Sequence, residues 1–537
     1  MMAAMRTSAL FFCMGLMVPL SAFGQASCPV QSPAPLTSAD RAYRARKYDE
    51  AESLFRAQIA SASDSKSRAI ATAGLIHTLV TARKTQESLK EASVSEAAFP
   101  KDAVVMEAVG YARFRHGETN AAAIAWNAAM HADPCNARVH YDVASYLRLN
   151  GMFASEEKQL DIARQLDPKN KNVALAYKVT TSAPLSMEER INRLKKRLET
   201  PGLSSDQRSS IQRAIAVAEV AGKGSCELVN PVPSTKIPIF AIMNGPDRIK
   251  ALGVQMTLNG KKKRFEIDSG ASGILISRSA AASAGLTAEA KSQNGGIGDE
   301  GPASISLAHV DDIHIGGMEF RNCMVRYFDK NDVLGDIDGL IGPDVFSQYL
   351  VTLDFASREM RLDPLPKRPG DSSTELRELD TAGQSSDADL TPHDRYIAPE
   401  MQDWTKVFRY GHYLLFPTHL NNGPSLLFLM DTGANRSMIS PEAARTITSV
   451  STDEDHHVKG ISGEVANVME ADNVTLEFAK VRVNVQHMSS YNTFGTAGGV
   501  AISGIIGFDA LRELVLSIDY RDNLVHVVYD PKARHAH

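Results

Sequence analysis

Two short motifs in the sequence place an aspartate before a hydroxyl residue and a glycine. Residues 268–270 read Asp-Ser-Gly and residues 431–433 read Asp-Thr-Gly, each after an apolar run and before an alanine. Two carboxylates held a few ångströms apart share one proton, because both cannot ionise cheaply. The ionised member can take a proton from water while the protonated member hydrogen-bonds a carbonyl oxygen. Asp268 and Asp431 are therefore the candidate catalytic residues.

Each motif lies in a similar stretch of chain, which predicts the elements that position it. A glycine eight residues before each aspartate suits a hairpin turn, and a serine nine residues after it suits a helix N-cap. The paired positions are Gly260 and Gly423, Ser277 and Ser440, and the Gly-ended segments 338–342 and 503–507. The offset between copies stays at 163 to 165 residues. This indicates a duplicated β-rich unit of roughly 120 residues, a domain-sized length.

Each copy resembles a retropepsin-type aspartic peptidase domain, the half-site unit of the retroviral proteases and their bacterial relatives. The matching features are the Asp-Ser/Thr-Gly-Ala loop, a Gly-rich segment about thirty residues later, and an apolar-apolar-Gly step before a short helix. The resemblance implies two units that pair about a pseudo-two-fold axis, each lending one aspartate. We expect β-barrel lobes at 237–363 and 401–532, joined by a long linker at 364–400.

The resemblance also implies supporting roles for the residues around the two aspartates. The motif glycines would let each loop approach the other without a Cβ clash. The motif hydroxyls would bond across to the partner loop, and a second glycine pair would let an apolar strand pass closely behind each loop. The supporting residues are Ser269, Gly270, Thr432, Gly433, Gly342 and Gly507.

Two Gly-rich segments are candidate flaps, hairpins that close over a substrate and exclude water. Their alternative is an ordinary flexible hairpin tip, and neither holds the flap tyrosine of pepsin-like enzymes. The flap residues are Gly296, Ile297, Gly298, Gly460, Ile461 and Gly463. Retroviral enzymes often place a second aspartate four residues after the first, whereas this chain has Ser272 and Asn435 there. We therefore expect a different grip on the substrate backbone.

Residues 36–222 are predicted to form an α-helical solenoid that resembles tetratricopeptide (TPR) repeats. Prolines and glycines recur there at a spacing of 34 residues, the period of that repeat. The repeated positions are Pro100, Pro134 and Pro168, and Gly117 and Gly151. The concave face of such a stack commonly binds protein. A recruiting arm and a rigid spacer both fit the pattern.

Residues 1–24 are predicted to form a secretory signal peptide, with a lone Arg6, an apolar run and small residues near the cleavage site. The run is too short to span a membrane comfortably. Lipid anchoring at Cys28 is disfavoured because an aliphatic residue is missing three positions before it. We expect a periplasmic or secreted protein without a transmembrane span.

The composition disfavours several other functions. A formal net charge of -5 gives no basic footprint for nucleic acid. Four cysteines would remain after leader removal, and the sequence does not pair them: Cys28, Cys135, Cys226 and Cys323. They lack metal-like spacing, and the adjacent His456 and His457 would face opposite sides of a strand. No metal and no cofactor is expected.

The sequence therefore predicts an exported aspartic endopeptidase that hydrolyses peptide bonds with a water activated between Asp268 and Asp431. A peptide or protein is the expected substrate, the repeats would hold a protein partner, and the site would be an intrachain pseudo-dimer. The alternative is a repeat-based binding or assembly protein with catalytically inactive lobes. Carboxylates within hydrogen-bond reach across a groove would favour the enzyme.

Overall fold

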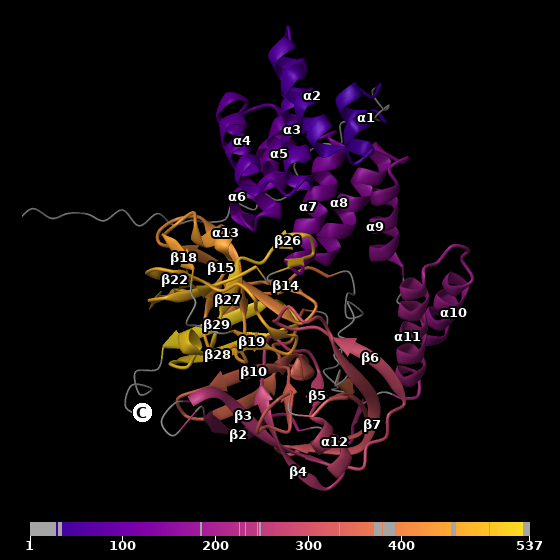
Figure 1. Ribbon diagram of the computed structural model, residues 1–537, viewed down its shortest axis with the longest axis vertical. Helices are drawn as coiled ribbons and strands as arrows, with labels where there is room; N and C mark the ends of the chain where they lie inside the picture. The colour runs from indigo at the N-terminus through magenta and orange to yellow at the C-terminus, as the bar shows by residue number, and fades with distance from the viewer. Residues whose placement is uncertain are drawn as a thin grey trace, which may run out of the picture.

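The computed structural model describes residues 28–30, 35–182, 185–224, 226–230, 232–243, 245, 249–331, 333–369, 378–379, 393–452, 458–492 and 495–529. The predicted leader, most of the predicted linker, and His456 and His457 lie outside these residues. The described chain is helical up to Ala221 and rich in strands after it (Figure 1). This confirms the predicted order of a helical solenoid followed by two β lobes.

Nine helices, α1 to α9, stack as antiparallel neighbours at the N-terminal end of the described chain (Figure 1). They are α1 (Ser38–Arg44), α2 (Tyr48–Ser61), α3 (Ser65–Thr81), α4 (Thr85–Ala98), α5 (Ala103–Arg115), α6 (Thr119–Ala132), α7 (Ala137–Leu149), α8 (Phe153–Leu166) and α9 (Lys171–Thr181). Helices α5, α7 and α9 begin 34 residues apart. Each follows an Asp or Asn N-cap whose side chain accepts two backbone N–H groups.

The turns within the helix pairs explain the repeated glycines. Gly117 and Gly151 have φ of 88° and 70°, a left-handed conformation that costs glycine little. Arg46 and Arg83 take the same conformation in the two earlier pairs. The earlier repeats therefore lack the glycine that marks the later ones.

A separate helical hairpin, α10 (Met187–Leu198) and α11 (Ser205–Ala221), lies against the first lobe (Figure 1). Val220 of α11 is buried with Ala290, Leu307 and Met324 of that lobe's strands. The helical segment thus divides into a repeat stack and a hairpin that covers lobe 1.

Lobe 1 contains the first copy of the duplicated unit. Its elements are β1 (Cys226–Leu228), β2 (Thr235–Met243), β3 (Ile249–Leu258), β4 (Lys261–Ile267), β5 (Ile274–Ile276), α12 (Arg278–Ser283), β6 (Ala290–Asn294), β7 (Ala303–Ile315), β8 (Met318–Phe328), β9 (Gly339–Ile341), the 3₁₀ helix η2 (Pro343–Phe346), β10 (Tyr349–Asp354) and β11 (Glu359–Pro364). Strand β9 runs parallel to β4 and antiparallel to β5, so it lies between them. The loop after β4 carries Asp268.

Lobe 2 repeats this arrangement. Its elements are β13 (Thr405–Lys406), β14 (Phe408–Tyr410), β15 (Tyr413–Leu420), β16 (Ser425–Met430), β17 (Met438–Ile439), α13 (Pro441–Ala444), β18 (Val450–Thr452), β19 (Lys459–Gly460), β20 (Gly463–Glu464), β21 (Met469–Ala471), β22 (Val474–Phe478), β23 (Val481–Val485), β24 (Met488–Ser490), β25 (Thr496–Ala497), β26 (Val500–Ala501), β27 (Gly504–Ile506), α14 (Phe508–Leu511), β28 (Leu514–Asp519) and β29 (Leu524–Tyr529). Strand β27 lies parallel to β16 and antiparallel to β17. The loop after β16 carries Asp431.

The paired hairpin turns differ slightly from expectation. In lobe 1 the left-handed residues are Asn259 and Gly260, at φ 45° and 73°. In lobe 2 they are Asn421 and Asn422, at φ 46° and 60°, so Gly423 follows the turn and is not its left-handed residue. Asparagine tolerates this conformation better than most residues.

One continuous sheet joins the lobes in the order β2-β11-β10-β28-β29-β13. The two central strands, β10 and β28, are antiparallel, and Thr352 pairs with Ser517. These two residues are equivalent positions of the duplicated unit, 165 residues apart. A residue that pairs with its own equivalent places a pseudo-two-fold axis between the two strands.

The repeat stack is fixed to lobe 2 through residues 393–395 at the end of the predicted linker. Phe153 N donates to His393 O at 3.0 Å, and Ser155 N and Oγ both donate to the Asp394 carboxylate. Arg395 Nη2 donates to Asn150 O at 2.6 Å and to Val407 O at 3.0 Å. Strand β12 (Glu378–Leu379) pairs with β1, so the linker also returns to lobe 1.

Apolar packing extends the same contact between repeats and lobe 2. One buried cluster includes Trp126 and Leu149 of the repeats together with Leu427 and Val500 of lobe 2. The Tyr146 ring lies 5.8 Å from the Phe408 ring, edge to face. The cluster is shared between the two parts, so each stabilises the other.

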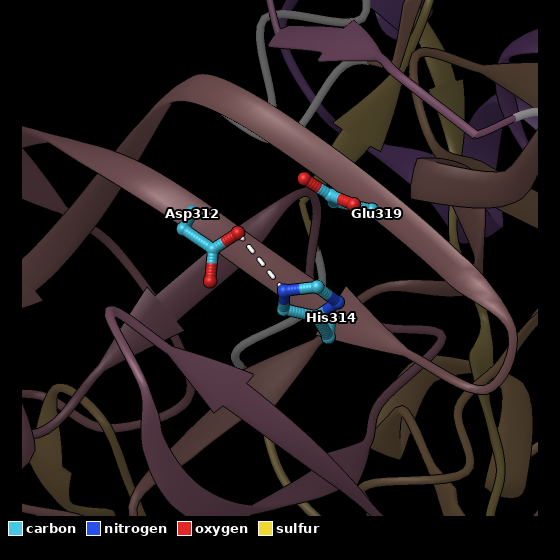
Figure 2. A group of neighbouring side chains, drawn as sticks. All are labelled: Asp312, His314 and Glu319. Atoms are coloured by element: carbon cyan, nitrogen blue, oxygen red, sulfur yellow. Dashed lines mark ion pairs between the residues drawn. The ribbon is translucent and has the colours of Figure 1, made fainter.

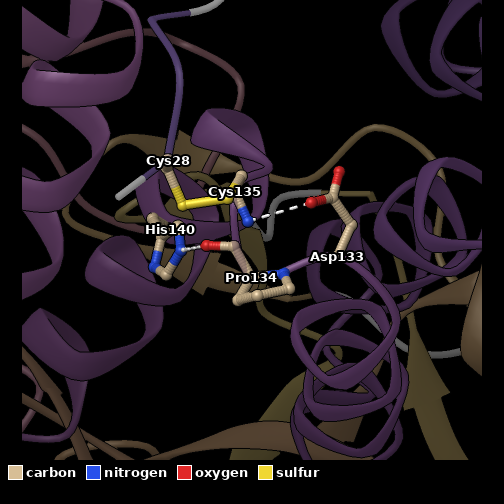
Figure 3. The surroundings of a disulfide bond; sticks show 5 residues. All are labelled: Cys28, Asp133, Pro134, Cys135 and His140. Carbon is tan, nitrogen blue, oxygen red and sulfur yellow. Dashed lines mark hydrogen bonds between the residues drawn. A yellow bond between two sulfur atoms is a disulfide. The ribbon is translucent and has the colours of Figure 1, made fainter. Parts of the chain in front are cut away.

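Two disulfides pair the four cysteines that the sequence left unassigned. Cys28 bonds Cys135, which ties the N-terminal segment to the turn before α7, where His140 Nε2 hydrogen-bonds Pro134 O at 2.9 Å (Figure 3). Cys226 bonds Cys323 and joins β1 to β8 within lobe 1. Among the described helices, none combines the length and apolar character that a membrane span needs.

Candidate active site

The two aspartates lie at the same point of the two lobes, directly after β4 and β16. Gly270 N and Ala271 N donate to Asp268 Oδ1 at 2.8 and 3.1 Å. In the second loop, Gly433 N and Ala434 N donate to Asp431 Oδ1 at 3.0 and 3.1 Å. Each loop therefore folds back on its own carboxylate and fixes the direction in which it points.

The motif hydroxyls bind the two loops to one another. Ser269 N donates to Thr432 Oγ1 at 3.0 Å, and Thr432 N donates to Ser269 Oγ at 3.0 Å. Each hydroxyl then donates to a main-chain carbonyl of the opposite lobe: Ser269 Oγ to Met430 O at 2.9 Å and Thr432 Oγ1 to Ile267 O at 2.7 Å. These four buried bonds set the separation of the loops.

The motif glycines are required by the opposing carboxylates. A Cβ built on Gly270 would lie 2.6 Å from Asp431 Oδ2, and one built on Gly433 would lie 2.5 Å from Asp268 Cγ. Both distances are shorter than any stable contact between these atoms. Each glycine thus makes room for the aspartate of the other lobe.

The two carboxyls form one protonation unit. Burial raises the pKa of Asp268, and the nearby Asp431 and Glu266 carboxylates raise it further. Burial also raises the pKa of Asp431, while a hydrogen bond from Asp268 and two backbone N–H groups lower it. The shared proton therefore belongs on Asp268 when Asp431 is ionised.

The second glycine pair closes the back of each loop. Asp268 N donates to Ile341 O and Asp431 N donates to Ile506 O, both at 3.0 Å. A Cβ on Gly342 would lie 2.5 Å from Ala271 O, and one on Gly507 would lie 2.6 Å from Arg436 O. The strands β9 and β27 can pass this close only because glycine ends them.

The two Gly-rich segments predicted as flaps hydrogen-bond to one another. Gly296 N donates to Ser462 Oγ at 3.1 Å and Ser462 N donates to Ile297 O at 2.9 Å. Glu300 N donates to Ser462 O at 2.8 Å. A Cβ on Gly460 would lie 2.5 Å from Ile297 O, and one on Gly298 would lie 2.4 Å from Ser462 O. Gly463 has φ of 88°, and Gly296 would meet Ile461 Cβ at 2.7 Å.

The apolar flap residues cross into the opposite lobes. Ile297 of lobe 1 packs against the buried cluster that contains Leu429 and Ile505 of lobe 2. Ile461 of lobe 2 packs against the cluster that contains Leu275 and Leu340 of lobe 1. The two predicted flaps are thus interlocked, because each packs against a buried cluster of the opposite lobe.

Comparison with known families agrees with this geometry. Residues 254–345 and 417–510 each match the family model described as aspartyl protease. Both lobes are therefore similar to the aspartyl protease family over these residues. No curated protein matches the sequence significantly.

Solved structures are similar to parts of the chain. An aspartic proteinase from Irpex lacteus is 11% identical and covers 56% of this chain and 99% of its own, with a TM-score of 0.34. A retropepsin-like aspartic protease from Rickettsia conorii is 20% identical and covers 24% and 92%, with a TM-score of 0.19. A TPR protein from Thermus thermophilus is 18% identical and covers 34% and 95%, with a TM-score of 0.25.

The two lobes also contain supporting residues that the sequence did not lead us to predict. Asp344 accepts from Ser272 Oγ at 2.7 Å and from Gly273 N at 3.1 Å. Asp509 accepts from the N–H and hydroxyl of Ser437 at 2.8 and 2.7 Å. Both acids follow the strand-ending glycine by two residues, a repeated Gly-x-Asp signal that the sequence displays.

The Ser272 position fits this view of the first loop. The Ser272 hydroxyl is buried and donates to Asp344, so it braces the first loop against η2. Arg326 Nη2 donates to Ser272 O as well. A side chain at this position therefore supports the loop, in place of the second aspartate of retroviral enzymes.

A histidine and a tyrosine of lobe 2 also reach the first catalytic loop. His412 Nε2 lies 3.1 Å from Gly270 O and donates to it. Burial lowers the pKa of His412 to about 4, although this hydrogen bond opposes the shift, so the ring is neutral at pH 7. Burial raises the pKa of the neighbouring Tyr413, and Asp431 and Asp268 add to the effect. Both residues lie at the β14–β15 turn.

One group of side chains has metal-like proximity among the described residues. Asp312, His314 and Glu319 offer ligand atoms within 4.8 Å of one another at the end of the β7–β8 hairpin (Figure 2). His314 pairs with Asp312 at 2.9 Å, and Arg321 Nη2 lies 2.9 Å from Glu319 Oε1. Arg321 thus already supplies a cation to Glu319, and we assign this surface group as an ion-pair network.

Proposed function

We propose that the protein is an exported aspartic endopeptidase whose dyad is Asp268 and Asp431. The observation that carries the proposal is that each buried carboxyl lies against the motif glycine of the opposite lobe, on loops that bind one another across the lobes. A fold that had lost this reaction would have no need for both aspartates and for both opposing glycines.

The proposed reaction uses one water molecule bound between the carboxyls. Asp431, as the ionised member, takes a proton from this water, and the oxygen attacks the scissile carbonyl carbon. Asp268 donates its proton to the carbonyl oxygen, which gives a neutral tetrahedral diol. Collapse of the diol breaks the C–N bond while the proton on Asp431 passes to the leaving nitrogen, and Asp268 regains the diol proton. The interlocked flaps exclude bulk water during these steps.

Replacing either aspartate tests the proposal. Asp268→Asn and Asp431→Asn should each lower kcat/KM on a mixed peptide library by roughly 1000-fold or more, because proton transfer through the pair is lost. Ser277→Ala, which removes only a helix N-cap in lobe 1, serves as the matched control. Near-parental cleavage by a folded Asp431→Asn protein would overturn the proposal and favour inactive lobes that bind partners.

Export is the second part of the proposal. The predicted leader and the two disulfides favour an oxidising compartment, because cytosolic thiols are usually kept reduced. N-terminal sequencing of the mature protein should find a start near Gln25 or Ser27. A mature protein that retains Met1 and free thiols would contradict export.

The repeat stack is proposed to recruit protein substrates or partners. Helix α9 exposes 58% of Leu175 and 61% of Val179, one turn apart on one face. Leu175→Glu with Val179→Glu should raise KM for a folded protein substrate and leave KM for a short peptide unchanged. Equal KM for both substrates in the variant would assign the stack as a rigid support for lobe 2.

A further inference from the structure

Glu266 is a buried acid in a strand that is otherwise apolar beside the dyad. It lies between Phe265 and Ile267 in β4, and it is only 7% exposed. Alternate residues of a strand point to the same face, about 7 Å apart. Glu266 and Asp268 are two residues apart, so the Glu266 carboxyl lies on the catalytic face, one pleat from the dyad.

Glu266 shares a face of the sheet with residues that contact one of the Gly-rich segments. Its partner in the parallel β4–β9 pairing is Leu340, so the two side chains share a face. Leu340 belongs to the cluster of Ile242, Ala251 and Leu275 against which the flap residue Ile461 packs. Glu266 is therefore on the side of the sheet that the flap covers.

The equivalent position in lobe 2 has no charge. Leu429 precedes Asp431 by two residues, pairs with Ile505 of β27, and is buried in the cluster that holds the flap residue Ile297. The wall of lobe 2 beside the dyad is thus apolar, whereas the wall of lobe 1 contains a carboxyl. Substrate side chains on the two sides of the scissile bond would therefore contact different groups, a carboxyl in lobe 1 and apolar side chains in lobe 2.

The Glu266 carboxyl has no hydrogen-bond or ion-pair partner among the described residues of the chain. The charged groups close enough to act on it are Lys250 at the start of β3, Asp268 and Asp431. Burial raises the pKa of Glu266 to about 7, with Lys250 opposing the shift and Asp431 adding to it. A buried carboxylate without a partner is unfavourable, and a cation supplied by a ligand would relieve that cost.

We propose that the subsite formed by lobe 1 beside Asp268 takes a lysine or arginine side chain of the substrate, and that the lobe 2 subsite takes an apolar one. The charged head would pair with Glu266, and the methylene stem would lie along Leu340 and Ile461. Cleavage would then fall between or next to one basic and one apolar residue. This inference rests on the proposed peptidase function.

Cleavage profiling of a peptide library tests the inference with the full chain. Parent protein should select Lys or Arg at one of the two positions that flank the cut. Glu266→Leu, which copies the lobe 2 residue, should lose kcat/KM for a Lys peptide by roughly 30-fold or more and gain on the matched Leu peptide. Glu266→Gln, which keeps the shape, should lose the basic preference and remain active.

A control and the contrary outcomes keep the test decisive. Leu429→Met conserves an apolar wall in lobe 2 and should preserve the basic preference. Cleavage by the parent without a basic residue beside the cut, or a basic preference that survives in Glu266→Leu, would overturn this inference alone. Absence of any cleavage by the folded parent would instead overturn the proposed function, and this inference with it.

Discussion

The two lobes are copies of one unit and share the elements that build the dyad, yet they differ in what surrounds it. Both keep the same aspartate loop, the cross-lobe hydroxyl, the strand-ending glycine and a Gly-x-Asp brace. They differ in what covers them, since α11 packs on lobe 1 and the repeat stack packs on lobe 2. They also differ beside the dyad, where Glu266 stands opposite Leu429.

The comparison distinguishes features that both lobes must keep from features that each lobe can change alone. Geometry that both carboxyls share must be present twice, because each loop is completed by the other. Walls and outer surfaces act on one side only, so a single chain can vary them independently. A homodimer of identical lobes lacks that freedom.

The largest expected difference in stability concerns the disulfide that only lobe 1 has. Removing Cys226–Cys323 as a double Cys→Ala variant should lower the free energy of unfolding of lobe 1 by about 4 kcal/mol, since the bond closes a loop of 97 residues. Hydrogen exchange in β1 and β8 should rise while that in β16 and β27 stays constant. The double Ala variant of Cys28–Cys135 is the control, and equal loosening of both lobes would contradict the prediction.

The next prediction concerns how stability depends on pH through Glu266, the buried acid beside the dyad that lobe 2 replaces with Leu429. Burial raises the pKa of Glu266 from near 4.5 to about 7, so its contribution to stability is full below pH 4.5 and is lost as pH rises through 7. Glu266→Gln should therefore match the parent at pH 4.5 and be more stable by about 3 kcal/mol at pH 8.5. Denaturant titration at both pH values measures this. If the free energy of unfolding differed between variant and parent by the same amount at both pH values, Glu266 would not be a buried acid without a partner.

The smallest effect tests whether the lobes contribute equally to their junction. Ser269→Ala and Thr432→Val each leave one N–H and one carbonyl of the opposite loop without a buried partner, which should cost about 2 kcal/mol. Both should also lower kcat. Thr352→Val breaks the Thr352–Ser517 bond on the same axis, away from the dyad, and should leave kcat unchanged. Unequal losses of stability in Ser269→Ala and Thr432→Val would show that the two lobes contribute unequally to their junction.

The sequence predicted the parts of the fold that recur along the chain, namely the two lobes and the helical repeats. The 163 to 165 residue offset located the lobes, and the 34-residue spacing of glycine and proline located the later TPR-like pairs. The earlier pairs escaped this pattern because Arg46 and Arg83 take the turn conformation there. Two disulfides could not be paired, since their partners are 107 and 97 residues apart and meet only in the folded chain.

Functional residues that occur in only one of the two lobes were harder to predict. Glu266 breaks an apolar strand and could have been noticed as a charge between Phe265 and Ile267. His412 gives no such signal, because its hydrogen bond to Gly270 O joins residues 142 positions apart. Contacts between parts of different origin, such as Tyr146 with Phe408, follow from packing that no local pattern encodes.

The interlocked Gly-rich segments set a condition on how a substrate would enter the proposed site. Ser462 N, Glu300 N and Asp299 N all donate to main-chain oxygens of the opposite flap. A ligand that separates the flaps must offer donors and acceptors at the same spacing, which an extended peptide backbone does and a compact folded surface does not. In the proposed peptidase, this opening would favour chain segments that can join a sheet as an extra strand.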